Sequence, residues 1–132
     1  MERETGAITV HRVQAAVDAG QPANPDGIRN QVEGGILQSL SWAMFEEVTF
    51  DDSKRTSFDW GSYPIMRFSD VPGAVDVHVM KRPGMPFLGA GETAQGPASA
   101  ALANALADAT GVRLRDMPLT PEKVKEAIGV AG

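Results

Sequence analysis

The sequence contains no cysteine, which excludes disulfides, thiolate catalysis and cysteine-held zinc or iron–sulfur centres within this chain. Histidine is scarce as well. The two histidines, His11 and His78, stand far apart, and neither has the neighbouring ligands that a metal site needs. We therefore interpret both as ordinary strand residues and predict no protein-ligated metal.

Basic residues are outnumbered, with 12 Lys and Arg against 17 Asp and Glu and a formal net charge of -5. Nucleic-acid affinity depends largely on clustered Lys and Arg, so a general phosphate-backbone binder is disfavoured. Long apolar runs are missing, and the first residues lack the basic-then-apolar pattern of a signal peptide. We expect a soluble chain without a membrane span. The compartment stays open between cytoplasm and periplasm, since any export signal would lie upstream.

What is present suffices for one domain with a real core, since 42% of the 132 residues are hydrophobic. Strand-like, Gly/Pro-rich and helical segments follow one another twice, which predicts an α+β, two-layer α/β arrangement with a mixed sheet and two main helices. Trp42, Phe45 and Trp60 are predicted to be core residues. The expected elements begin with a strand over 7–19, which has a bulge or a short turn near His11 and Arg12, and a helix over 24–47. A hairpin over 48–60 and a strand over 74–80 follow. A helix that Gly111 ends has a stripe of Ala98, Ala101, Leu102, Ala105, Leu106 and Ala109, and a short helix capped by Thr120 comes last.

The stretch GAGE places one carboxylate, Glu92, at the exit of a tight turn with Gly89 and Gly91. One interpretation is helix-start chemistry, because an acid is favoured at the positive end of the following helix. The other is a general base, because glycines let a bulky ligand approach. A dinucleotide-binding loop is rejected, since Gly89, Gly91 and Gly96 do not have its spacing and no strand precedes them.

A second glycine pair, Gly34 and Gly35, interrupts the first long helix in the stretch QVEGG. Each interior glycine costs about 1 kcal/mol relative to alanine, so close approach of a backbone or ligand should offset it. On an ordinary amphipathic helix, Gln31 and Glu33 would simply face solvent. Beside exposed backbone, a side-chain amide could instead recognise the donor and acceptor edges of a heterocycle.

Three stretches, residues 17–52, 62–80 and 89–122, occur together in this order. They resemble the C-terminal part of the large, molybdopterin-binding subunit of the xanthine dehydrogenase / aldehyde oxidase family. The nearest resemblance is to the bacterial branch with isoquinoline 1-oxidoreductase-like β subunits. It covers nearly the whole chain, from about Thr5 to Glu122. It implies a molybdopterin-dependent oxidoreductase that hydroxylates aldehydes or N-heterocycles.

The resemblance also implies roles for particular residues. Glu92 is the base that activates a molybdenum-bound hydroxide, and Gln31 contacts the cofactor, expected in its cytosine dinucleotide form. The family often has proline where this chain has Thr93, so the turn is expected to differ in shape. The glycines that let backbone approach the cofactor are Gly34, Gly35, Gly89 and Gly91. Iron–sulfur clusters would be held on a partner subunit or domain.

The family's subunit is several times longer, and its upstream part supplies the substrate pocket. Residues 1–132 are therefore expected to be a C-terminal fragment of a molybdenum cofactor-binding domain, inactive in isolation. Its expected partners are the upstream remainder of the subunit, an iron–sulfur subunit and a small aldehyde or N-heterocyclic substrate. The alternative is a truncated or stand-alone remnant without catalysis, an interaction or self-associating module with exposed apolar surface.

Overall fold

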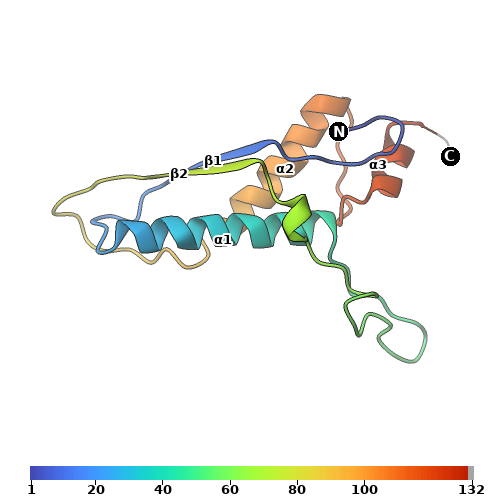
Figure 1. Ribbon diagram of the computed structural model, residues 1–132, viewed down its shortest axis with the longest axis horizontal. Helices are drawn as coiled ribbons and strands as arrows, with labels where there is room; N and C mark the ends of the chain where they lie inside the picture. The colour runs from blue at the N-terminus through green and yellow to red at the C-terminus, as the bar shows by residue number, and fades with distance from the viewer. Residues whose placement is uncertain (131–132) are drawn as a thin grey trace.

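The computed structural model describes residues 1–130 and contains both strands and helices (Figure 1). This composition confirms the α+β class. The elements in chain order are β1 (Arg12–Val17), α1 (Pro25–Met44), the 3-10 turn η1 (Phe68–Asp70), β2 (Ala74–Val79), α2 (Gln95–Thr110) and α3 (Pro121–Ala127).

The two strands pair in parallel, with Arg12 opposite Ala74 and Val17 opposite Val79. Side chains alternate along both strands, so that Val17 and Val79 are buried while His78 is exposed at the opposite face. The first strand is shorter than predicted. Its partner β2 begins at Ala74, opposite Arg12, so β2 has no residue that pairs with residues 7–11. Pro72, which has no N–H to donate, comes shortly before that end.

The sheet and the hairpin differ from the prediction. The sheet is not mixed, because its two strands are parallel. In the described chain, antiparallel pairing is limited to isolated bridges, Gly20 with Phe87 and Phe50 with Arg55. Residues 46–66, which we call the arm, project from the body near the end of α1 (Figure 1). A two-stranded ribbon is marginal unless another layer covers it, and the large apolar side chains Phe50 and Phe58 of the arm stay exposed. The hairpin therefore reduces to a short ladder closed by the bond from the Thr56 N–H to the Thr49 carbonyl, 2.8 Å.

Helix α1 begins where the sequence predicts. The Asn24 side chain accepts a hydrogen bond from the Gly27 N–H at 3.0 Å, and Pro25 occupies the first turn, where a missing N–H is harmless. An apolar stripe at helical spacing along α1 is buried at Val32, Ile36 and Leu40. This stripe packs against β2 on one side and α2 on the other, which makes α1 the centre of the fold.

Helix α2 ends at Gly111, which has φ +75°, as predicted for a helix C-terminus. Its buried stripe is narrower than expected. Among the described elements, α1 is the one that packs closely on α2, so residues at i, i+4 and i+8 suffice to fill the contact. The buried members of the stripe are Ala98, Leu102 and Leu106, while Ala101, Ala105 and Ala109 are exposed.

The final helix, α3, is capped by Thr120, whose hydroxyl accepts from the Lys123 N–H at 3.4 Å. Val124 is fully buried, and the preceding Leu119 donates its N–H to the carbonyl of Ala43 at 2.7 Å. The segment that precedes α3 is thereby tied to the end of α1. Within residues 1–130, no helix is both long and apolar enough to cross a membrane.

Candidate functional site

The loop from β2 to α2 returns along the segment that follows β1 and then delivers Glu92 to the side of α1. The Arg82 guanidinium binds the Asp18 carboxylate at 2.8 Å, and the Leu88 N–H donates to the Ala19 carbonyl at 3.0 Å. The hydrogen bond from Arg82, followed by one from the Gly20 N–H, holds the pKa of Asp18 below its usual range. This long loop is therefore tethered at several points before it reaches the glycine turn.

Gly20 allows the closest approach along this path. It has φ +68°, and a Cβ at this position would lie 1.9 Å from the carbonyl oxygen of Pro86. Only glycine fits both the left-handed backbone and this contact. The sequence gives no sign of this contact, because Gly20 and Pro86 are distant in the chain.

Gln31 and the glycine turn, two features singled out in the sequence, meet in the structure. The Gln31 side-chain N–H2 donates a hydrogen bond to the Gly91 carbonyl at 2.7 Å, across 60 residues of sequence. Gly91 directly precedes Glu92, so the amide of Gln31 lies beside the residue that presents the carboxylate. Gln31 is exposed, as the solvent-facing interpretation expects, whereas Glu33 is half-buried.

Glu92 is exposed, and none of the hydrogen bonds or ion pairs found within residues 1–130 involves its carboxylate. Thr93 follows it, also exposed, and the cap of α2 is Ala94, which makes no side-chain capping bond. A helix-capping role would require the carboxylate to accept a backbone N–H of the first turn. Glu92 therefore makes no capping bond, while its favourable interaction with the positive end of α2 needs no such bond and stays an open interpretation beside the general base.

The glycines fall into two environments. A Cβ added at Gly34, Gly89 or Gly91 would meet no atom within 4 Å, so a ligand could lie against the backbone at all three. Gly35 differs because it is buried, and an added Cβ would lie 3.4 Å from the Cβ of Ala94. Its observed role is to let α1 approach the turn before α2, and it offers no exposed backbone.

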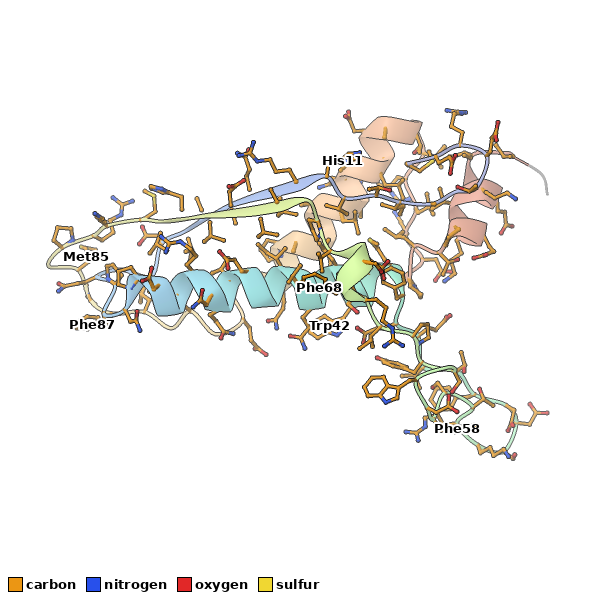
Figure 2. All side chains as sticks on the ribbon, viewed as in Figure 1. His11, Trp42, Phe58, Phe68, Met85 and Phe87 are labelled. Atoms are coloured by element: carbon orange, nitrogen blue, oxygen red, sulfur yellow. The ribbon has the colours of Figure 1, made fainter. Side chains whose placement is uncertain are left out.

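A groove of about 390 Å³ runs beside Gln31, within the size range of small-molecule sites. It lies between the start of α1 and the returning loop, where Figure 2 shows Phe87 beside the first turn of the helix. Its walls combine apolar side chains, such as Ile28 and Phe87, with glycine backbone and three side-chain amides, those of Gln21, Asn24 and Gln31. A planar heterocycle with donors and acceptors on its edges fits such walls, so the residues present suit a pterin.

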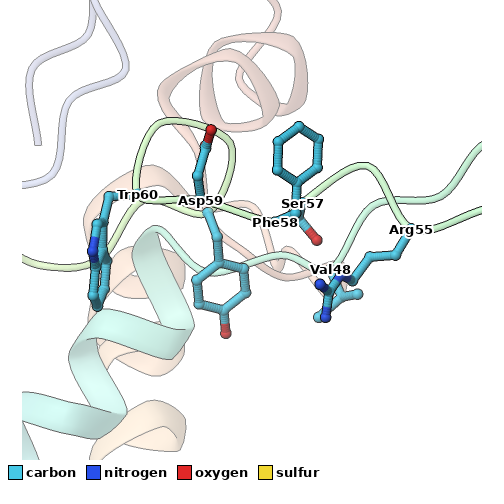
Figure 3. Close-up of a pocket in the computed structure, with 7 residues that line it drawn as sticks. Val48, Arg55, Ser57, Phe58, Asp59 and Trp60 are labelled. Atoms are coloured by element: carbon cyan, nitrogen blue, oxygen red, sulfur yellow. The ribbon is translucent and has the colours of Figure 1, made fainter.

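A second hollow, about 570 Å³, lies in the arm and contains none of the predicted site residues (Figure 3). Its walls are mostly exposed side chains of one irregular segment, including Phe58 and Trp60, which is 69% exposed. The prediction that Trp60 is core is therefore wrong, because no second layer covers the arm in the described chain. Trp42 is also exposed, at 43%, whereas Phe45 is partly buried against the core.

Residues 1–72, more than half of the chain, match the family described as the molybdopterin cofactor-binding domain. The chain belongs to this family, whose members bind the molybdopterin cofactor.

Among curated relatives, the chain is 44% identical over its full length to a nicotinate dehydrogenase subunit of Pseudomonas putida, and it spans 11% of that protein. It is 35% identical to the β subunit of isoquinoline 1-oxidoreductase from Brevundimonas diminuta, over 90% of this chain and 15% of the relative. Identity to the nicotinate dehydrogenase subunit thus exceeds identity to this isoquinoline 1-oxidoreductase subunit. The chain corresponds to a small part of each of these proteins.

Among solved structures, the aldehyde oxidoreductase of Desulfovibrio gigas superposes with a TM-score of 0.81 at 30% identity, covering 95% of this chain and 14% of that one. The CO dehydrogenase of Oligotropha carboxidovorans has the same fold, with a TM-score of 0.84 at 22% identity over 96% of this chain and 17% of that one. The two-layer arrangement seen here is thus one segment of a fold that solved enzymes contain.

Proposed function

We propose that this chain forms part of a molybdenum hydroxylase that oxidises aldehydes or N-heterocycles. The observation that carries the proposal is the hydrogen bond from Gln31 to the Gly91 carbonyl. It brings the side-chain amide that is proposed to contact the cofactor next to the turn that presents Glu92. Nicotinate dehydrogenase and isoquinoline 1-oxidoreductase are named for N-heterocycles, and the D. gigas enzyme for aldehydes. These names support the substrate class.

In this proposal the cofactor is held by Gln31 and by the open backbone of Gly34, Gly89 and Gly91. Gln31 uses one N–H for Gly91, which leaves its carbonyl oxygen and second N–H for the edge of the pterin. The cytosine dinucleotide form of molybdopterin belongs to the same proposal. When bound, the cofactor supplies an oxygen derived from water and accepts the two electrons removed from the carbon.

Glu92 serves as the general base. Its exposed carboxylate takes a proton from the oxygen nucleophile as that oxygen attacks the electron-poor carbon. Proton removal raises the electron density on the oxygen, which is what the attack requires. The open surface at Gly89 and Gly91 leaves room for reactants in front of the carboxylate.

The proposed partners follow from what this chain lacks. It has no cysteine, so iron–sulfur clusters that carry electrons away would be held on another subunit or domain. The substrate pocket would come from the remainder of the large subunit, since this chain spans 11–18% of the length of its curated relatives.

The test is Glu92→Gln in the complete enzyme, a change that keeps the size of the side chain and removes its basicity. We expect turnover to fall by about 10²- to 10⁴-fold, the usual contribution of a general base, with molybdenum content unchanged. Glu126→Gln, an exposed acid on α3, is the matched control and should keep wild-type turnover. A Glu92→Gln enzyme that retains molybdenum and turns over at the wild-type rate would refute the proposed base.

A self-associating or interaction module is the second candidate function, favoured by the exposed aromatic side chains Phe50, Phe58 and Trp60 of the arm. Co-expression with the upstream part of a large subunit, followed by metal analysis, separates the two candidates. Molybdenum retained only in the assembled form supports the enzyme. A chain that self-associates, does not co-purify and holds no metal supports the module.

A further inference from the structure

Helix α1 contacts the Glu92 turn on both sides of the carboxylate. On the N-terminal side, Gln31 binds the Gly91 carbonyl at 2.7 Å. On the C-terminal side, the Ser39 hydroxyl donates to the Gln95 carbonyl at 2.5 Å, and the Gln95 side-chain N–H2 donates to the Gln38 side-chain oxygen at 2.9 Å. Gln31 and Gln38 are about two helical turns apart, so both lie on the same face of α1.

The Ser39 contact is the buried part of this arrangement. Ser39 is fully buried, and its hydroxyl also lies 2.5 Å from the hydroxyl of Ser99, which in turn donates to the Ser39 carbonyl at 3.3 Å. In a helix, the carbonyl of the first residue bonds the residue four positions later, so Ser39 occupies the second lone pair of Gln95. Buried hydrogen bonds of this kind are costly to lose because water cannot replace them.

The connection continues to Glu92 through the backbone. The Gln95 N–H donates to the Glu92 carbonyl at 3.3 Å, which closes the turn that presents the carboxylate. A shift of Gln95 therefore moves Glu92. The Glu92 side chain itself has no hydrogen bond to any residue that the structure describes, so its position depends on how its backbone is held.

We propose that Ser39 is a positioning residue for Glu92, acting through Gln95, and that the contacts from α1 fix the position of the turn. The inference rests on the proposed function, since it assigns Ser39 a role in placing the general base. A misplacement of about 1 Å at a reacting group costs up to about 10²-fold in rate, so a remote anchor of this kind has catalytic consequences.

The helix offers a matched control. Ser41 lies two residues beyond Ser39, is also buried and is also hydrogen-bonded, but its partners are the Met66 N–H at 2.9 Å and the Glu46 carboxylate. Ser39→Ala and Ser41→Ala therefore remove the same hydroxyl group from the same helix. The first variant loses hydrogen bonds to α2, and the second loses hydrogen bonds to the arm.

The first measurement is amide hydrogen exchange by NMR on the 132-residue chain. In Ser39→Ala we expect exchange at Gln95, Ala98 and Ser99 to rise about tenfold relative to Leu106, as the loss of a buried hydrogen bond predicts. In Ser41→Ala the increase should appear at Met66, with Gln95 unchanged. Equal increases at Leu106 and Gln95 in Ser39→Ala, or the same pattern in both variants, would overturn the positioning role.

The second measurement uses the complete enzyme. Ser39→Ala should lower kcat by about tenfold to a hundredfold at unchanged molybdenum content, with KM within about twofold of wild type. A rise in KM or a loss of molybdenum, with kcat unchanged, would contradict the inference. Should Glu92→Gln prove fully active, the proposed base is wrong, yet the exchange data still decide whether Ser39 holds the turn.

Discussion

The packed body and the arm both contain large apolar residues, but these residues are buried in the body and exposed in the arm. In the body, Val32, Ile36 and Leu40 of α1 lie under β2 and beside α2, each almost fully buried. In the arm, Phe50 and Phe58 remain about as exposed as polar residues, although both are large and apolar. Apolar composition alone thus does not make a core, because burial requires a second element on the other side.

The arm keeps its shape through local hydrogen bonds. The Asp51 carboxylate accepts the N–H groups of Ser53 and Lys54, and the Asp59 carboxylate accepts that of Ser62. These bonds, led by the Ser53 and Ser62 N–H groups, hold the pKa values of both carboxyls below their usual range. Turn geometry is therefore set within a few residues, whereas packing in the body joins segments that are far apart in the chain.

The largest expected contrast comes from truncating one apolar side chain in each region. Ile36→Ala should destabilise the chain by about 2–5 kcal/mol, because it removes buried contacts and leaves a cavity between α1 and its neighbours. Phe58→Ala should change the free energy of unfolding by less than about 0.5 kcal/mol, because that side chain is 70% exposed. Urea unfolding followed by circular dichroism measures both. Equal effects would mean that the arm is packed in solution.

A smaller contrast uses two glycines. Gly20→Ala should destabilise the chain by roughly 1–3 kcal/mol, since it forces a side chain into a left-handed backbone and against the Pro86 carbonyl. Gly34→Ala should stabilise it by about 0.5–1 kcal/mol, because α1 gains a better helix former in open space. Thermal unfolding of the two variants measures both changes, and a shift of the same sign in both would contradict the contrast.

Gly34→Ala also tests the proposed cofactor surface. If the backbone at Gly34 lies against the cofactor, this variant combines a more stable isolated chain with a lower molybdenum content in the complete enzyme. Thermal unfolding and metal analysis of the same variant measure the two quantities. Unchanged molybdenum content would remove Gly34 from the cofactor-binding residues.

The smallest effect is the pH dependence of the tether at Asp18. Its pKa in the folded chain lies below the ordinary value of 3.8, mainly through the Arg82 hydrogen bond. A lowered folded-state pKa contributes stability above the unfolded value, and this contribution is lost as pH falls below about 3.8 through the folded value. Amide exchange at Gly20 and Leu88 should therefore quicken in that range. Asp18→Asn should abolish this pH dependence, and an unaltered profile would show that other groups control it.

Local patterns determined most of the secondary structure. Asn24 and Pro25 start α1, Gly111 ends α2 and the alternating valines form β2, because capping, backbone conformation and side-chain period all act over a few residues. Glu92 and Gln31 were singled out in the same way, and the family resemblance assigned them roles that stay predictions.

Tertiary structure decided how these parts meet. The bond between Gln31 and Gly91, the contact of Gly20 with Pro86 and the burial of Ser39 against α2 each join residues 56 or more positions apart. Such contacts depend on how α1, α2 and the returning loop dock, and docking is set by the sum of many side-chain contacts. The sequence by itself determined which carboxylate stands at the glycine turn, and only the docking of α1 decided what holds it there.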